Sequence, residues 1–132
     1  MRPQSILRFI ALIILLVSCG SDETISGYAD RKMIYALASI DNAPFTARAT
    51  IAFAKEGAVN GTRPCNTFQA AQSVPYPWFA LGPIASTRRA CPDLGQETAY
   101  FAALADMRFA EVAGTVLILS NKAGGEMVFQ AE

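Results

Sequence analysis

The sequence predicts a mainly β domain of the α+β class, an antiparallel sheet or partial barrel of about six to eight short strands with one amphipathic helix. Three observations support this prediction. Short apolar or alternating segments recur along the chain with turn residues between them. Residues 93–107 are the one segment with clear helical spacing. Strand-like segments lie on both sides of it, so the helix is expected to pack on a sheet built from both halves of the chain.

The predicted strands are separated by residues that favour turns. Residues 41–44, DNAP, mark one turn, and residues 55–57, KEG, mark another that is expected to close a hairpin. The two prolines of VPYPW, residues 74–78, cannot occupy a central strand because proline has no backbone N–H to donate. The predicted strand segments are 32–40, 47–53, 58–62, 65–71, 78–84, 109–112, 116–120 and 126–130.

The helix is predicted to start at Pro92 and Asp93, which favour helix N-termini. Arg108 lies beyond its far end, where a positive charge is favoured. All 11 acidic side chains, including Glu97 in the first turns, are expected to be solvated charges or caps. The face expected to pack on the sheet contains Leu94, Thr98, Phe101, Leu104 and Met107.

The N-terminal segment MRPQSILRFIALIILLVSC resembles a bacterial lipoprotein signal. Two arginines come first, followed by the apolar run 9–17, a small residue and Cys19. That order is typical of a secretory signal. The apolar run is about half of the roughly 20 residues that span a bilayer, so a permanent transmembrane helix is the weaker alternative. Residues 16–19, LVSC, resemble the lipobox, in which the cysteine is lipidated before the signal is removed; an ordinary secreted protein is the alternative.

Lipidation at Cys19 predicts a bacterial cell-envelope protein in three parts: a signal peptide (1–18), a flexible tether (19–30) and a domain (31–132). Gly20 and Ser21 do not match the aspartate that often retains lipoproteins in the inner membrane. We therefore expect a lipid-anchored chain that faces the periplasm, with the outer membrane favoured. Removal of the signal leaves 9 basic and 11 acidic side chains, a net charge of −2, which predicts no nucleic-acid partner.

Two cysteines remain after Cys19, and in an oxidising compartment Cys65 and Cys91 are expected to form a structural disulfide. The alternative is a reactive thiolate at Cys91, favoured by Arg88, Arg89 and the helix start. This alternative is weaker because the chain has neither C-x-x-C spacing nor any histidine. The lack of histidine also removes Ser-His-Asp and Cys-His catalysis and nearly all mixed His/Cys zinc sites. No catalytic residue, metal or cofactor is predicted.

Several motifs resemble the META domain, which is shared with HslJ-type heat-shock proteins. They are NG at 60–61 leading to CNTF at 65–68, the run LGPIASTRRACP at 81–92, and VLIL at 116–119. The resemblance covers about residues 31–131. It implies a small, mainly β fold with one helix, common in envelope lipoproteins and without established catalytic residues. Pro64 replaces the glycine usual before the Cys-Asn step, and Thr67 stands where arginine often follows, so no role of that arginine is carried over.

A candidate binding surface comprises Arg88, Arg89, Trp78, Tyr76 and Asn66. Cationic and aromatic side chains together suit an anionic glycan, a lipid headgroup or a loop of an envelope protein. The alternative is structural. The aromatic side chains would then fill the core or brace the proline turn, the arginines would be solvated or pair with acidic neighbours, and the asparagine would satisfy turn backbone.

Three functions remain open at this point. The leading one is a non-catalytic, lipid-anchored envelope domain with an interaction or stress-protection role, as the resemblance implies. The second is an inhibitor of a secreted or periplasmic hydrolase that presents the loop 86–89. The third is a thiol redox protein that uses Cys65 and Cys91.

Overall fold

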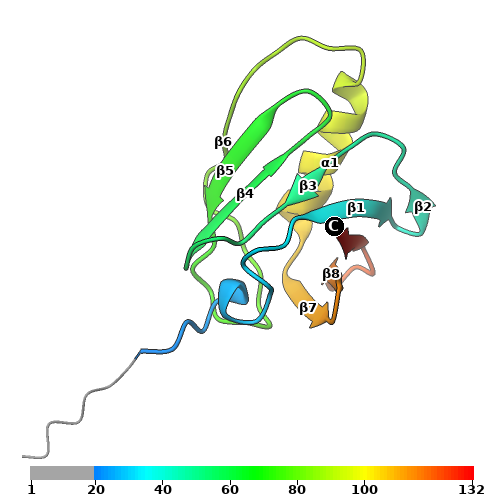
Figure 1. Ribbon diagram of the computed structural model, residues 1–132. Coiled ribbons are helices and arrows are strands. Elements are labelled where there is room, and N and C mark those ends of the chain that lie inside the picture. Colours follow the sequence, from blue (N-terminus) through cyan, green and yellow to red (C-terminus); the bar gives the residue numbers. More distant parts are fainter. Residues whose placement is uncertain (1–19) are drawn as a thin grey trace, which may run out of the picture.

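The computed structural model describes residues 20–132 (Figure 1). Cys19 and the predicted signal lie outside the described residues. Residues 20–132 form two antiparallel sheets, which do not close into a barrel, and a single α-helix, so the predicted mainly β class is confirmed. No helix in this part of the chain is long and apolar enough to cross a membrane. The elements are η1 (Ile25–Gly27), β1 (Tyr35–Ile40), β2 (Ala43–Pro44), β3 (Thr50–Ile51), β4 (Ala58–Thr62), β5 (Thr67–Ala71), β6 (Ala85–Ser86), α1 (Leu94–Asp106), β7 (Phe109–Ala113), β8 (Val116–Ser120) and β9 (Glu126–Ala131).

The larger sheet has the order β2-β1-β9-β8-β7, with β3 also paired to β1. Its centre joins the first long strand to the last, because β1 lies antiparallel to β9. The smaller sheet has the order β4-β5-β6. Asp41 and Asn42 adopt positive φ angles of 51° and 66°, the conformation of a two-residue hairpin turn, and thereby confirm the turn predicted between β1 and β2.

Two connections join the sheets. On one side, β3 pairs with β1 and Ala52 continues as a bridge to Asn60 in β4. The segments around Thr50 and Gly61 are so close here that a Cβ on Gly61 would collide with the carbonyl group of Thr50, so only glycine fits. The predicted strand 47–53 is thus reduced to two residues of β3, because this segment leaves one sheet for the other.

On the other side, residues 76–79 run along the edge of β7. The N–H of Phe79 donates to the carbonyl of Arg108 at 2.8 Å, and the N–H of Ala110 donates to the carbonyl of Pro77 at 2.8 Å. The predicted strand 78–84 is wrong. Trp78 forms only an isolated bridge with Phe109, and the strand that joins β5 is the later, two-residue β6. The proline-rich segment crosses between the sheets instead of lying in one.

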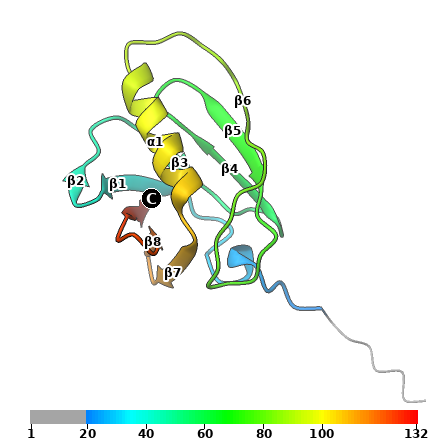
Figure 2. The ribbon, with the colours of Figure 1, turned by 180° about the vertical axis from the view of Figure 1, so that it is seen from behind.

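Helix α1 packs across the gap between the two sheets (Figure 2). Tyr100, which is fully buried, contacts Phe68 of β5 and donates a hydrogen bond from its hydroxyl to the carbonyl of Thr50 at 3.2 Å. Burial raises the pKa of Tyr100 far above its usual value. The helix was predicted with the right bounds but in part with the wrong face. Its buried residues are Glu97, Tyr100 and Leu104, whereas Leu94 is 53% exposed and Thr98 is also exposed.

The predicted flexible tether is wrong for residues 24–29. Ile25 is 1% exposed and Ala29 is 7% exposed, and both belong to the core. Ile25 begins the single turn η1, and the N–H of Ala29 donates to the carbonyl of Ile25 at 2.8 Å, which places both apolar residues on one side. The domain therefore extends N-terminal to residue 31.

Asp22 holds this N-terminal turn in place. Its carboxylate accepts hydrogen bonds from the N–H and hydroxyl of Thr24 (2.9 and 2.6 Å), from the hydroxyl of Ser26, and from Arg31 (2.6 Å). Partial burial raises the pKa of Asp22, but the hydrogen bonds from Ser26, Thr24 and Arg31 outweigh it and hold the pKa below its usual value. The polar composition that suggests a tether in fact builds a closed local network.

Replacement of Ile25 by alanine tests this correction. We expect Ile25→Ala to lower the free energy of unfolding by about 2–4 kcal/mol, because it removes a buried side chain from the core. The measurement is urea unfolding of the chain from residue 20. Ser21→Ala, at an exposed position four residues before the start of η1, is the control and should change stability by less than about 0.5 kcal/mol. Equal, negligible effects of the two variants would contradict the packing of η1.

Candidate functional site

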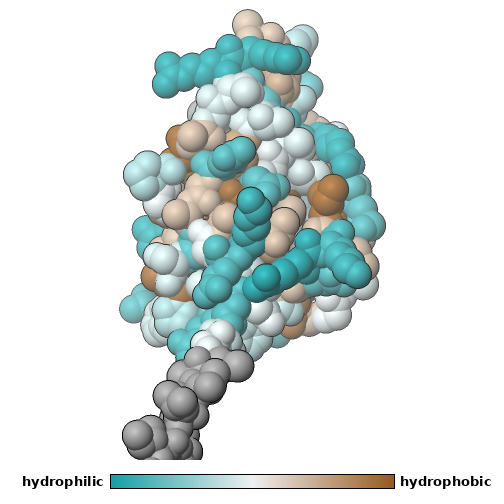
Figure 3. Space-filling view, turned by 60° about the vertical axis from the view of Figure 1, so that its left-hand side comes forward, coloured by the Kyte–Doolittle hydropathy of each residue, from teal (hydrophilic) through white to brown (hydrophobic). Residues whose placement is uncertain are grey.

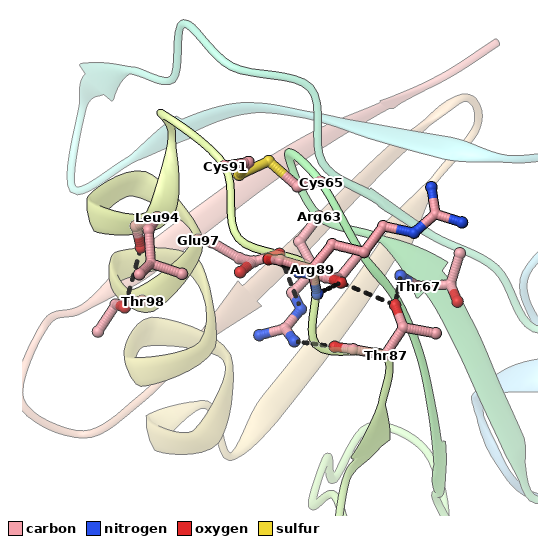
Figure 4. Close-up of a disulfide and its surroundings, with 10 residues drawn as sticks. Arg63, Cys65, Thr67, Thr87, Arg89, Cys91, Leu94, Glu97 and Thr98 are labelled. Carbon is pink, nitrogen blue, oxygen red and sulfur yellow. Dashed lines mark hydrogen bonds and ion pairs between the residues drawn. A yellow bond between two sulfur atoms is a disulfide. The ribbon is translucent and has the colours of Figure 1, made fainter.

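A disulfide joins the β4–β5 connection to Cys91, which lies three residues before the first residue of α1 (Figure 4). Cys65 and Cys91 are bonded, with their Cα atoms 6.2 Å apart and 26 residues apart in the chain. Both cysteines are half-buried. The predicted pairing is present, and it closes the long loop that contains β5, the proline-rich segment and β6.

Beside the disulfide lies a carboxylate that the sequence did not mark as buried. Glu97, in the first turns of α1, is only 2% exposed, which corrects the expectation that it is a solvated charge. Its Oε1 lies 3.2 Å from Nε of Arg63 and accepts a hydrogen bond from the side-chain amide of Asn66 at 2.8 Å. The Arg63 contact is an ion pair without the alignment of a hydrogen bond. A buried carboxylate needs such partners because desolvation of an unpaired charge is costly.

Arg63 holds several groups at once. Its guanidinium carbon lies 3.8 Å from the centre of the Phe101 ring, a cation–π contact with the same helix that carries Glu97. Its Nη2 donates to the hydroxyl of Ser86 at 2.9 Å and to the carbonyl of Thr87 at 3.2 Å. Sequence reasoning missed this residue. The sequence did contain a signal for it. Glu97, Tyr100 and Leu104 share one face of the predicted helix, so burial of that face also buries an acid, which then needs a cation as its partner.

Asn66 fixes the loop that follows β6. Its Oδ1 accepts hydrogen bonds from the N–H of Arg89 at 2.7 Å and from the hydroxyl of Thr87 at 2.9 Å, and its amide also donates to the carbonyl of Arg89 at 3.3 Å. It is 5% exposed. Asn66 therefore satisfies backbone groups, as the structural alternative expected, and does not belong to an open binding surface.

The rest of the predicted binding surface is divided between two ends of the domain. The carbonyl of Trp78 accepts a hydrogen bond from Gln72, just after β5, whereas the hydroxyl of Thr87 accepts one from Thr67 at the start of β5. Five residues of strand separate these points, about 16 Å at roughly 3.3 Å per residue. Arg88 and Arg89 are exposed at the end near the disulfide. The structure does not bring them together with Tyr76 and Trp78.

This arrangement is a structural brace. The charges of Glu97 and Arg63 neutralise each other, and the sulfurs of Cys65 and Cys91 are bonded. Within residues 20–132, no three side chains of the metal-ligating types cluster together. On the face drawn in Figure 3, hydrophobic residues are separated by hydrophilic ones. The class of protein defined here is a small two-sheet domain whose single described α-helix is tied to the smaller sheet by an interior ion pair and a disulfide.

The chain belongs to the META domain family, because the family model matches residues 31–132. Its fold is similar to that of a protein from Burkholderia xenovorans solved by NMR, with a TM-score of 0.65, 18% identity, and coverage of 82% of this chain and 86% of that one. A second NMR structure has a TM-score of 0.59 and 18% identity, covering 76% and 89%.

A crystal structure of a DUF4847 family protein from Bacteroides vulgatus has a TM-score of 0.53 and 15% identity, with coverage of 62% of this chain and 57% of that one. Among curated proteins, no significant match to this chain is found. Identities this low show a shared fold and nothing about ligands.

Removal of the interior acid tests the brace. We expect Glu97→Ala to lower the free energy of unfolding by about 3 kcal/mol, because it leaves Arg63 without its partner in the interior. Glu56→Ala, at an exposed turn position, is the matched control and should change stability by less than about 0.5 kcal/mol. Urea unfolding measures both. Equal losses in the two variants would show that Glu97 is not held as described.

Reduction of the disulfide tests whether the bond is structural. A closed loop of 26 residues predicts a loss of about 3–4 kcal/mol on reduction, seen as a marked fall in melting temperature. Intact mass after alkylation of the native protein should show no modified Cys65 or Cys91 until a reductant is added. Ready alkylation of Cys91, or rapid exchange with glutathione without loss of stability, would instead support the redox alternative.

Proposed function

We propose that this chain is a lipid-anchored, non-catalytic domain of the bacterial cell envelope, which faces the periplasm and acts through interaction or stress protection. The observation that carries the proposal is that each of the three cysteines fits an exported, lipid-anchored chain. Two of them form the disulfide between Cys65 and Cys91, and the third ends the lipobox-like LVSC at Cys19. Disulfides persist in oxidising compartments, which agrees with export of the chain.

The interior of the domain supports a non-catalytic role. The buried carboxylate of Glu97 and the guanidinium of Arg63 neutralise each other, and the buried side-chain amide of Asn66 binds backbone groups. The chain contains no histidine to act as a general acid or base near neutral pH. Membership of the META domain family adds no catalytic residue to this set.

A second candidate function is inhibition of a secreted hydrolase. The observation that favours it is the loop at Arg88 and Arg89, whose side chains are exposed while the backbone of Arg89 is fixed by Asn66 and by the neighbouring disulfide. A rigid loop loses little conformational entropy on binding. The same two cations would suit an acidic loop of an envelope protein or an anionic glycan.

The anchor is tested by expression of the full chain in a bacterium supplied with alkyne-labelled palmitate. We expect incorporation of the label, recovery in the membrane fraction, and an intact mass of the processed chain that starts at a lipidated Cys19. Cys19→Ser should abolish the label, whereas the double variant Cys65→Ser/Cys91→Ser should retain it. An unlabelled wild-type chain, or a mature chain that starts at another residue, would refute lipid anchoring.

A further inference from the structure

The folded part of the domain begins very close to the proposed anchor. Asp22 is fixed by Thr24, Ser26 and Arg31, so only Gly20 and Ser21 separate Cys19 from the first fixed residue. Three residue steps span at most about 11 Å. An acyl chain on Cys19 would therefore hold this end of the domain against the bilayer surface.

The same end of the domain carries a row of aromatic rings, in which Tyr28 and Trp78 are exposed and Tyr76 and Phe109 are half-buried. The loop after β5 passes beside η1 at the end where the described chain begins (Figures 1 and 2). Within it, the N–H of Tyr76 donates to the carbonyl of Glu23 at 2.7 Å, and the ring of Tyr76 stacks on Tyr28 with centroids 4.2 Å apart. Tyr28 is 55% exposed, although it follows η1 directly.

The aromatic row continues along β7. Trp78 lies two residues beyond Tyr76 in the segment that pairs with β7, and its ring lies 5.2 Å from that of Phe109. Trp78 is 52% exposed. The two rings line an apolar groove of about 620 Å³ that also contains Val74, Pro75, Phe79, Ala80, Arg108 and Lys122.

Two cations border this groove. Lys122 is exposed, and Arg108 is exposed while its guanidinium also donates to the carbonyls of Ala105 and Met107. Two exposed anions also lie near the row: Glu111, two residues beyond Phe109 in β7, and Glu23, whose carbonyl accepts the N–H of Tyr76. Aromatic rings beside lysine and arginine are typical of surfaces that lie at the membrane interface, where the rings contact the headgroup region and the cations contact phosphates.

We propose that the row Tyr28, Tyr76, Trp78 and Phe109 is a membrane-contact surface, which lies on the bilayer that holds the anchor. This rests on the proposed function. A bilayer is favoured over a protein partner because the short distance from Cys19 presents this surface to lipid at a high effective concentration. A surface of this kind needs little affinity of its own, because the anchor has already removed most of the translational freedom.

The experiment uses Trp78, which is the only tryptophan of the chain. Residues 19–132, which retain every contact described here, are coupled through the Cys19 thiol to a maleimide lipid in vesicles, with the disulfide intact. This coupling replaces cellular lipidation, so the result does not depend on whether a cell lipidates the chain. We expect a blue shift of Trp78 emission and at least twofold quenching in vesicles whose acyl chains carry bromine, relative to vesicles without bromine. Emission that is unchanged by brominated lipid would overturn the proposal.

Matched variants separate the surface from the tether. Tyr28→Ser should weaken the quenching of Trp78 by about half, whereas Leu94→Ser, which removes an equally exposed apolar side chain beside the disulfide, should leave it unchanged. Lys122→Glu should weaken it, and Arg88→Glu, at the far end, should not. Equal quenching in all four variants would mean that the linkage alone brings Trp78 to the lipid, and would overturn the proposal. If the vesicle result holds while cells attach no lipid to Cys19, only the proposed anchoring fails.

Discussion

The burial of Glu97 is the constraint on which much of this domain depends. A carboxylate in the interior requires charge and hydrogen-bond partners at fixed positions. Arg63, directly after β4, and Asn66, directly before β5, are these partners. The same two residues also bind β6 and the loop that follows it. One acid on α1 thus links three segments: the β4–β5 connection, the loop after β6 and the helix itself. The disulfide ties two of these segments again, so the covalent and the ionic links reinforce each other at one place.

Much of the fold could be predicted because its signals are local. The hairpin turn at Asp41 and Asn42, the short apolar runs of β8 and β9, and the helical spacing in α1 all depend on residues close in sequence. The cysteine pairing followed from counting alone. Two of the motifs that resemble the family contain the bonded Cys65 and Cys91, and the third, residues 116–119, lies in β8.

The features that escaped prediction depend on distant partners. Glu97 looks like any acid in a first helical turn, and its burial depends on Arg63, 34 residues earlier, which itself looks like a surface arginine. Ile25 lies in a segment whose polar composition predicts a linker, yet its side chain is part of the core formed by later strands. Arg88 and Trp78 are predicted to share a surface because they lie in neighbouring segments, but the chain between them runs back along β5 and separates them.

The path of residues 76–79 has a further consequence for self-association. An uncovered strand edge offers unpaired N–H and C=O groups to a neighbouring copy, a danger that grows when proteins are concentrated on a surface. Here the segment occupies the outer edge of β7. The opposite edge ends in β2, which is two residues long and carries Pro44, a residue without a backbone N–H. Both ends of the larger sheet are therefore poor templates for another strand, which opposes edge-to-edge addition of crowded copies along this sheet.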